Sequence, residues 1–305
     1  MDEFDLPAAC GIDEVMRRDH FLLEGAEGNL WYEQRSLKVL FVTFDNLATL
    51  DDPYPRLPWM HSRVTGLGYS LLGVQSFAKD WFRQATAPDF IRALQARGFF
   101  ARFETVVFVG ASMGAFAALN FATLVPGARV LAFSPQSTMS QKICPFETRF
   151  GYAVRRSNWT DPLFLDAADA TPHLAGAVIL YDPFVPEDRA HAARLTGPNI
   201  TRVKAGHFTH QAIRVVIKCD ALPEMFAEYA ETGLLGADFW RRLRARKGLR
   251  VWRRAFMESL VRRGQPKRIL HAANAMLRNE SYLFAHTARA DVLKAHPELQ
   301  TKAAR

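Results

Sequence analysis

One serine in this sequence stands in a setting that favours reactivity. Ser112 lies in a Gly-x-Ser-x-Gly motif at residues 110–114, directly after an apolar run and directly before a segment rich in Ala and Phe. This pattern predicts a buried strand, a tight turn at the serine and then a helix. Because a serine hydroxyl alone is a poor nucleophile, chemistry at Ser112 requires a neighbouring base that takes its proton.

The two glycines of the motif have a steric role. The serine must adopt a strained backbone conformation to raise its hydroxyl clear of the sheet. Side chains two residues before and two residues after it would then collide, and Gly110 and Gly114 remove that collision. The helix that begins behind Ser112 directs its free N–H groups at any negative charge forming there. The N–H of Met113 is therefore the first candidate donor of an oxyanion hole.

With its strand and helix, this motif resembles the nucleophile elbow of the α/β-hydrolase superfamily, which often reads Gly-x-Ser-Met-Gly. That family orders its triad as nucleophile, acid and histidine, each just after a strand. Residues 181–186, Tyr-Asp-Pro-Phe-Val-Pro, resemble its acid loop, and residues 205–208, Ala-Gly-His-Phe, resemble its histidine loop. The similar layout covers residues 35–232. The resemblance implies a mostly parallel α/β sheet flanked by helices and a triad of Ser112, Asp182 and His207.

In this triad His207 is the base that activates Ser112, and Asp182 fixes the tautomer of the histidine and stabilises its charged form. Each assignment has a rival. Asp188 follows Asp182 by six residues and is an alternative acid, and His210 follows His207 by three residues. His207 is preferred because it lies in the loop directly after a glycine.

The second oxyanion donor is expected in the loop after an early strand, where residues 43–48 read Thr-Phe-Asp-Asn-Leu-Ala. Many family members have a His-Gly-Gly type loop at this place. The backbone N–H of Asn46 or of Leu47 can donate here. Asp45 is a departure, because its carboxylate would oppose the stabilisation of an anion unless it turns away or binds substrate hydroxyls.

Short apolar runs that alternate with helical patterns predict the scaffold of these loops. Strands are expected at residues 37–44, 69–74, 105–109, 129–133, 178–181 and 200–204, and helices at 88–97, 114–125 and 211–231. Continuous apolar runs are typical of parallel strands covered by helices on both faces. Residues 1–30 show no sustained periodicity, and no strand is expected there.

Residues 134–177 lie between two predicted strands, at the place where this superfamily commonly inserts a lid. They carry five aromatic residues, namely Phe146, Phe150, Tyr152, Trp159 and Phe164. Together with Arg149, Arg155 and Arg156 they suggest a lid with an aromatic wall and a cationic rim, suited to an acyl or sugar-bearing substrate with some negative charge. An ordinary surface excursion is the alternative.

From residue 233 onward the strand signals vanish, so residues 1–232 are interpreted as the hydrolase-type domain and 233–305 as a basic helical tail. Helices are expected at 255–263, 266–278 and 282–295, with Gly264 at a turn and Ala272 and Ala275 at a close contact. This arrangement resembles a tetratricopeptide-type hairpin, although a solenoid needs about three repeats.

The tail also concentrates the positive charge of the chain, whose formal net charge is +8. Residues 241–268 contain twelve Lys and Arg residues and one acidic residue, Glu258. Such a stretch forms either a solvated helix face or a contact with an anionic partner, such as an acidic protein, a polysaccharide or a membrane surface. Nucleic acid is the least favoured partner, because no recognised nucleic-acid motif is present.

The remaining reactive residue types give weaker signals. Cys10, Cys144 and Cys219 are odd in number and widely spaced, so they are expected to be buried or incidental thiols rather than a disulfide framework or a zinc site. His191 is expected to be solvated on the helix after the acid loop. The acidic N-terminus lacks the layout of a signal peptide and no apolar run reaches about 18 residues, which indicates a cytoplasmic protein.

Three functions follow from these patterns. The first is a serine esterase or acyl hydrolase that acts through an acyl-enzyme on a small-molecule or glycan-linked ester and needs no metal or organic cofactor. The second is a hydrolase-fold binding or scaffold protein whose tail makes the partner contacts, and the third is acyl transfer to a sugar hydroxyl. The enzyme requires hydrogen bonds from Ser112 to a histidine and from that histidine to an acid, whereas the scaffold requires neither.

Overall fold

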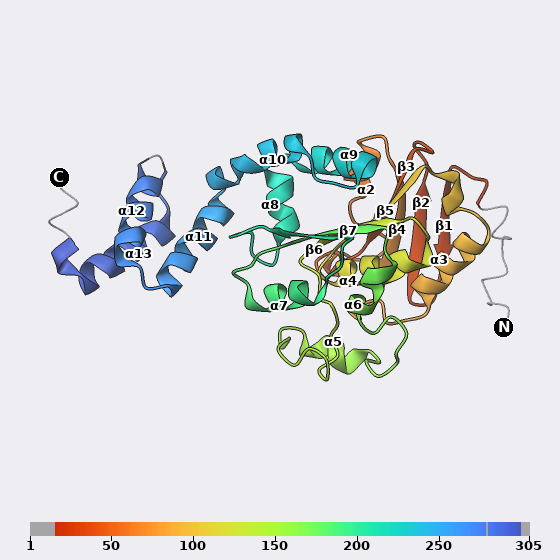
Figure 1. Ribbon diagram of the computed structural model, residues 1–305, viewed down its shortest axis with the longest axis horizontal. Coiled ribbons are helices and arrows are strands. Elements are labelled where there is room, and N and C mark those ends of the chain that lie inside the picture. Colours follow the sequence, from red (N-terminus) through yellow and green to blue (C-terminus); the bar gives the residue numbers. More distant parts are fainter. Residues whose placement is uncertain (1–15, 279, 300–305) are drawn as a thin grey trace.

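The computed structural model describes residues 16–278 and 280–299 and is built around one eight-stranded sheet (Figure 1). The strand order is β1-β2-β4-β3-β5-β6-β7-β8. The β1–β2 and β2–β4 pairs are antiparallel, and every other pair of neighbours is parallel. The strands are β1 His20–Glu24, β2 Gly28–Glu33, β3 Val39–Phe44, β4 Ser70–Ser76, β5 Thr105–Ala111, β6 Arg129–Phe133, β7 Gly176–Tyr181 and β8 Ile200–Lys204.

Helices cover both faces of this sheet, as the continuous apolar runs predict (Figure 1). The helices of the sheet domain are α2 His61–Thr65, α3 Thr86–Ala96, α4 Met113–Phe121, α5 Gly151–Arg156, α6 Ala167–Ala170, α7 Pro186–Arg194, α8 Ala212–Lys218, α9 Leu222–Thr232 and α10 Ala237–Leu243. Alternate side chains of β5 show the two layers: Val106 and Phe108 pack with α3 and α4, whereas Val107 and Val109 pack with α8 and α9. The expected fold class is confirmed as a mostly parallel α/β sheet flanked by helices, with a C-terminal helical extension.

Two parts of the scaffold differ from the sequence-based expectation. Strand β1 and the start of β2 lie within residues 1–30, where no strand was expected. Both are antiparallel strands at one end of the sheet and lack long apolar runs. The helix expected over residues 211–231 is divided into α8 and α9. Asp220 adopts a left-handed conformation with φ of 52°, and Pro223 lies in the first turn of the second helix.

The C-terminal extension consists of α11 Arg250–Arg262, α12 Pro266–Leu277 and α13 Leu283–Ala295. Its buried residues from Met257 to Val292 form an apolar cluster of their own. Phe239 and Leu243 of α10 pack instead into the core of the sheet domain. Packing therefore changes from the sheet domain to the extension within α11, downstream of the expected division at residue 233.

The hairpin details of the extension are also different. Gly264 lies at the turn after α11 with a φ of 57°. Ala273 and Ala285 are fully buried between the helices, whereas Ala275 is exposed and Ala272 is half-buried. The close contact between the helices is therefore made by Ala273 and Ala285, and not by Ala272 and Ala275 as expected.

Two of the cysteines match their expectation. Cys144 and Cys219 are buried free thiols, and burial raises the pKa of each. Cys10 and the acidic N-terminal stretch lie outside the described residues. Within residues 16–278 and 280–299, no helix is long and apolar enough to cross a membrane.

Candidate active site

Ser112 lies at a sharp turn between β5 and α4, at the carboxyl edge of the sheet. Its backbone has a φ of 53° and a ψ of −117°, outside the regions that side chains normally allow. A Cβ at Gly110 would lie 2.1 Å from the carbonyl oxygen of Gly114, and a Cβ at Gly114 would lie 2.7 Å from the carbonyl oxygen of Phe44. The two glycines of the motif therefore permit the turn and the close approach of α4 to β3.

Ser112 lies within hydrogen-bonding distance of a histidine, and this histidine lies within hydrogen-bonding distance of a carboxylate. The Nε2 atom of His210 lies 2.9 Å from Ser112 Oγ, and its Nδ1 atom lies 2.9 Å from both carboxylate oxygens of Asp188. Since the Asp188 carboxylate can only accept, Nδ1 carries the ring proton and Nε2 is left as an acceptor for the serine hydroxyl. The Asp188 side chain is fully buried, and that of His210 is 27% exposed.

The expected base His207 is not part of this chain of contacts, which corrects the sequence-based assignment. Its ring stacks on Phe184 at 4.4 Å and meets Trp252 and Phe256 edge-on. The loop after β8 contains two left-handed residues, His207 at φ 68° and Thr209 at φ 62°. They turn the chain so that His210, three residues later, contacts Ser112.

The expected acid Asp182 is likewise occupied by the backbone. One carboxylate oxygen accepts the N–H of Phe184 at 2.9 Å, and the other accepts the N–H of Thr209 at 2.7 Å. The first bond is an Asx-turn, which an Asp-Pro sequence favours. Asp182 therefore connects the loop after β7 to the loop after β8. The alternative acid Asp188, in the first turn of α7, is the carboxylate that contacts His210.

Arg149 joins this group from the insertion between β6 and β7. Its guanidinium lies 2.8 Å from Asp188 Oδ1 and 2.5 Å from a carboxylate oxygen of Glu147. Burial alone would raise the pKa of Glu147, but hydrogen bonds from His191 and Arg149 outweigh it and lower this pKa to about 2. The guanidinium thus bridges two buried carboxylates, one of which holds His210.

His191 is the other partner of Glu147, and the expectation of a solvated residue is wrong. The side chain is completely buried. Its Nδ1 atom accepts the backbone N–H of Ser137 at 3.1 Å, so Nε2 donates to Glu147 at 3.1 Å. His191 belongs to the buried network behind Arg149 and has no contact with Ser112.

Gln136 is a neighbour of Ser112 that the sequence analysis missed. Its Oε1 atom lies 3.2 Å from Ser112 Oγ and accepts the indole N–H of Trp81 at 3.2 Å. Since the indole N–H can only donate, Trp81 fixes the orientation of the amide. The serine hydroxyl therefore has two acceptors, His210 and Gln136. The only signal in the sequence is the place of Gln136, just beyond the end of a strand adjacent to β5.

Candidate backbone N–H donors come from two segments beside Ser112. Met113 is the first residue of α4, so its N–H has no acceptor within the helix. In the loop after β3, the N–H of Asn46 donates to Thr49 Oγ1 at 3.3 Å, whereas no acceptor for the N–H of Leu47 is found among the described residues. Leu47 is therefore the better second donor of the two considered.

Asp45, the departure in this loop, turns away from the serine. Its buried carboxylate pairs with Arg56 at 2.6 Å and accepts the backbone N–H groups of Trp59 and Ser76. Burial raises the pKa of this carboxyl, although Arg56 opposes the shift. Asp45 consequently braces the loop and does not place a carboxylate in the position of the oxyanion.

Ser112 and His210 open into a cleft of about 630 Å³. Its apolar walls come from the segments after β3 and before α2, from α8 and from the insertion, and they consist of Leu47, Leu57, Pro58, Trp59, Met60, Phe150, Ile213 and Ile217. Asp52 and Arg214 are its charged lining residues. The cleft has the size and mostly apolar character of a small-molecule site.

The insertion contributes to this cleft differently from the lid that was expected. Among the described residues of the insertion, Phe150 lines the cleft, 6.0 Å from the His210 ring. Trp159 and Phe164 pack against Phe116 and Phe121 of α4. Since Arg149 is bound to buried carboxylates, the expected rim of three arginines is not present at the cleft.

Comparison with known proteins gives similarity in structure alone. No protein-family model matches the sequence, and no curated protein matches it significantly. The Pyrococcus furiosus esterase Pf2001 is 15% identical, with 73% of this chain and 94% of that chain covered and a TM-score of 0.43. An esterase from Pyrobaculum calidifontis is 14% identical, with 71% of this chain and 86% of that chain covered and a TM-score of 0.48. The capsule O-acetyltransferase of Neisseria meningitidis serogroup A is 10% identical, with 66% of this chain and 93% of that chain covered and a TM-score of 0.42.

Proposed function

We propose that this protein is a serine hydrolase that cleaves esters through an acyl-enzyme on Ser112, with His210 as the base and Asp188 as the acid. The observation that carries the proposal is the chain of 2.9 Å contacts from Ser112 Oγ to His210 and from His210 to Asp188. A binding or scaffold protein has no need of this arrangement at a strained serine beside a cleft.

In the first half of the reaction, Ser112 Oγ attacks the ester carbonyl while its proton passes to His210 Nε2. Asp188 accepts the Nδ1–H and stabilises the imidazolium that forms. The N–H groups of Met113 and Leu47 donate to the carbonyl oxygen as it becomes negative. The tetrahedral intermediate collapses when Nε2 returns the proton to the leaving alcohol.

The second half repeats these roles with water. Water gives a proton to His210 Nε2 and attacks the acyl carbonyl, and the proton then returns to Ser112 Oγ as the acid leaves. The apolar walls of the cleft favour an uncharged acyl group of moderate size. The cleft therefore supports a small-molecule ester as substrate, with water as the acceptor of the acyl group in the proposed hydrolysis.

Covalent labelling with a fluorophosphonate probe tests the proposal. Wild type is expected to label, and Ser112→Ala and His210→Ala are each expected to lose at least about 99% of the labelling rate, since the serine is then absent or has no base. Hydrolysis of p-nitrophenyl acetate and butyrate is expected to fall in parallel. The mass of the labelled peptide identifies the modified residue.

His207→Phe is the matched control, because it removes the other histidine of the same loop and keeps an aromatic ring against Phe184. It is expected to label within about tenfold of wild type, since His207 has no contact with Ser112. Loss of labelling in His207→Phe with retention in His210→Ala would refute the assignment. A folded wild type that neither labels nor hydrolyses either ester would refute the hydrolase itself.

A further inference from the structure

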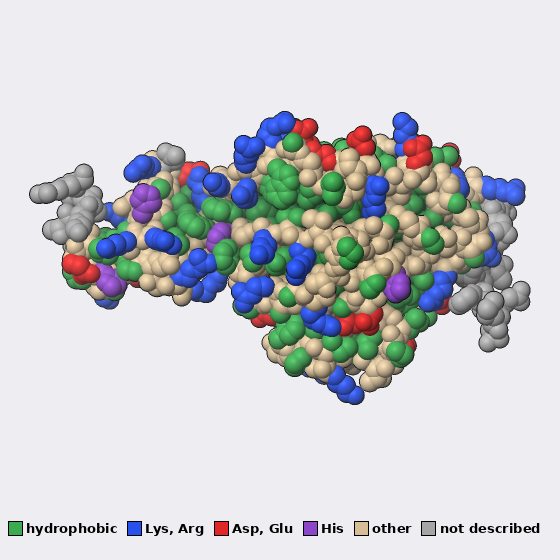
Figure 2. Space-filling view, in the orientation of Figure 1, with side chains coloured by type: hydrophobic (Ala, Val, Ile, Leu, Met, Phe, Trp, Pro, Cys, Tyr) green, Lys and Arg blue, Asp and Glu red, His purple; other side chains and the backbone are tan. Residues whose placement is uncertain are grey.

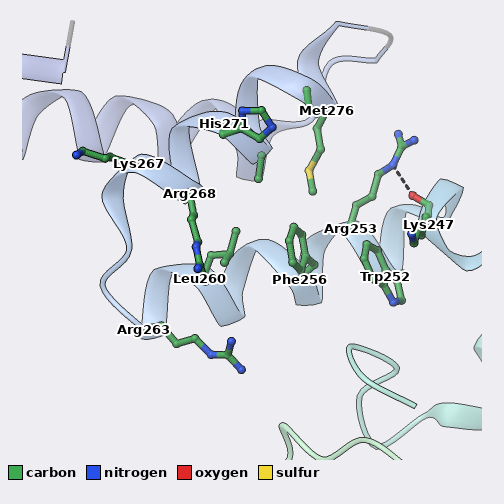
Figure 3. Close-up of a pocket in the computed structure, with 12 residues that line it drawn as sticks. Lys247, Trp252, Arg253, Phe256, Leu260, Arg263, Lys267, Arg268, His271 and Met276 are labelled. Atoms are coloured by element: carbon green, nitrogen blue, oxygen red, sulfur yellow. Dashed lines mark hydrogen bonds between the residues drawn. The ribbon is translucent and has the colours of Figure 1, made fainter. Parts of the chain in front are cut away.

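A groove in the C-terminal extension lies between α11, α12 and the short 3-10 segment η5 Arg244–Gly248 (Figure 3). Its volume is about 640 Å³. Trp252, Phe256 and Leu260 are spaced by four residues and therefore share one face of α11. Met276, together with two alanines of α12, faces them across the groove. The apolar stripe on α11 extends over eight residues, or about 12 Å.

Cationic side chains stand at both ends of this stripe (Figure 3). Lys247 and Arg253 lie beside Trp252, and Arg268 lies beside Leu260. Lys267 and Arg263 lie beyond Leu260, and the Arg263 side chain is directed away from α12. None of the residues that line the groove is acidic. In the same orientation as the ribbon, Lys and Arg side chains are scattered over the extension with few acidic side chains between them (Figure 2).

Most of these cations do not form ion pairs with neighbouring carboxylates. Several other arginines of the basic stretch are paired: Arg241 with Asp238, Arg242 with Glu224 and Arg254 with Glu258. Among the residues that the structure describes, Lys247, Lys267 and Arg268 form no ion pair. Arg263 also forms none, but its guanidinium lies 4.6 Å from the centre of the Phe184 ring. Arg253 donates to Tyr282 Oη at 2.6 Å and to the Lys247 carbonyl oxygen at 2.9 Å, and reaches Glu280 at 3.5 Å. Among the described residues, unpaired cations thus stand at both ends of the apolar groove, and others, such as Arg250 and Arg262, lie elsewhere on the extension.

We propose that this groove binds a peptide segment of a partner protein, in which an apolar stripe is flanked by acidic residues at both ends. The apolar anchors of the segment fill the space between Phe256, Leu260 and Met276, as in other helix-in-groove interfaces. Its acidic residues pair with the two cationic ends of the groove, which fixes register and orientation.

The distribution of charge favours a peptide over the other anionic ligands. A fatty acid or a lipid has one headgroup and satisfies one end of the groove, leaving the other end unpaired. A membrane surface is flat on this scale and cannot enter a groove between two helices. A nucleic acid places charge along its whole length and has no continuous apolar stripe to cover Phe256 and Leu260.

The site is distinct from the proposed catalytic cleft but adjacent to its histidine loop. The indole N–H of Trp252 donates to the carbonyl oxygen of Gly206 at 3.0 Å, and Trp252 and Phe256 both contact the His207 ring. A partner docked in the groove therefore lies on the far side of the loop that carries His210. The inference does not depend on the proposed hydrolase activity.

Fluorescence anisotropy with designed peptides tests the groove in the full-length chain. The probe is a fluorescein-labelled helical peptide with Leu and Phe anchors at i, i+4 and i+7 and two Glu residues at each end. Saturable binding is expected, with at least a tenfold loss when Lys replaces every Glu and a loss of affinity as salt rises. A peptide with Glu at one end only is expected to bind more weakly than the full probe.

Charge reversal supplies the matched variants. Lys267→Glu/Arg268→Glu is expected to weaken binding at least tenfold, since it repels the acidic end of the probe. Arg250→Glu/Arg254→Glu changes the net charge equally on exposed residues that do not line the groove, and is expected to bind within about twofold of wild type. Circular dichroism and thermal unfolding serve as checks that both variants are folded.

Three outcomes would overturn the proposal: no saturable binding of the acid-flanked probe, equal affinity in the two charge-reversal variants, or tighter groove-dependent binding of another ligand. The ligands compared are phosphatidylserine-containing vesicles, dodecanoate and a single-stranded oligonucleotide. Tighter binding of vesicles or dodecanoate that is lost in Lys267→Glu/Arg268→Glu would assign the groove to a lipid. Tighter binding of the oligonucleotide would assign it to nucleic acid.

Discussion

Asp182 and Asp188 follow β7 and lie six residues apart, but their carboxylates have different partners. Asp182 accepts two backbone N–H groups, whereas Asp188 accepts the Nδ1–H of His210 and an N–H of Arg149. Asp182 therefore shapes the loops, and in the proposed mechanism Asp188 serves the reaction. The same substitution at the two positions separates these duties.

Asp188→Asn is expected to lower the labelling rate by roughly 10³–10⁴-fold, because an amide can stabilise the wrong tautomer of His210 and cannot stabilise its charged form. Asp182→Asn keeps one acceptor oxygen and is expected to lower the rate by less than about tenfold, with a loss of about 1–2 kcal/mol in the free energy of unfolding. Labelling kinetics and urea denaturation of both variants measure the difference. Equal rates in the two variants would contradict the assignment of the acid.

Arg149 is a positioning residue for this acid. Arg149→Lys keeps the charge, but an ammonium group cannot bridge Glu147 and Asp188 with the planar geometry of a guanidinium. The rate of ester hydrolysis is expected to fall by about tenfold in kcat, with a smaller change in KM. Arg149 does not line the cleft and reaches it only through its contact with the Phe150 ring at 5.3 Å. Arg155→Lys, an exposed residue of the same insertion, is expected to behave as wild type. A change confined to stability would leave Arg149 with a structural role only.

At the scale of elements, the order of strands and the turn at Ser112 follow from local patterns. The steric demand at Gly110 and Gly114 concerns residues four apart in the chain, so a sequence motif can express it. The choice between His207 and His210 depends instead on two left-handed residues and on aromatic rings from α11, more than forty residues away. Long-range packing of this kind leaves no local pattern, and the resemblance to a family loop favoured the wrong histidine.

The role of Asp182 could be predicted from the sequence in part, because one of its two hydrogen bonds is local. The Asx-turn at Asp182 is formed within three residues, and the Asp-Pro sequence predicts it. The second bond of Asp182, to the N–H of Thr209, is long-range and could not be read from the sequence. Strands β1 and β2 were missed for a similar reason, because partners in the sheet rather than apolar runs hold them.

The loop after β8 also carries a pH dependence of stability through His207. Burial lowers the pKa of His207; Asp182 opposes this effect, and Arg263 and Arg262 add to it. The unfolded chain therefore takes up this proton at a higher pH than the folded chain. The stabilisation is complete above the unfolded pKa of about 6.5 and declines as the pH falls below it.

His207→Phe removes that titration and keeps a ring in the cluster. Between pH 7.5 and pH 5.5, the melting temperature of wild type is expected to fall more than that of His207→Phe, and all other titrating groups are shared by the two proteins. Differential scanning fluorimetry at closely spaced pH values measures the two curves. Parallel curves would show that His207 is solvated in both states.

At the scale of the whole molecule, a nearly self-contained helical extension is attached to the sheet domain through an aromatic cluster, beside Leu249 and Val251, which pack against the core of the sheet domain. Phe184 and His207 belong to the loops after β7 and β8, and Trp252 and Phe256 belong to α11. The guanidinium of Arg263 lies 4.6 Å from the centre of the Phe184 ring and adds a cation–π contact. The attachment therefore meets the two loops that hold the proposed acid and base.

Trp252→Ala is expected to loosen this attachment and to show whether it supports the reaction. Loss of a large, half-buried ring and of its bond to Gly206 is expected to cost about 2–4 kcal/mol of unfolding free energy. The labelling rate is expected to fall several-fold, because the loop that presents His210 loses a brace. Trp240→Ala, at a 43% exposed ring of α10, is expected to change stability by less than about 1 kcal/mol and to leave labelling unchanged. If Trp252→Ala were destabilised as expected but labelled at the wild-type rate, the extension would hold on to the histidine loop without positioning its base.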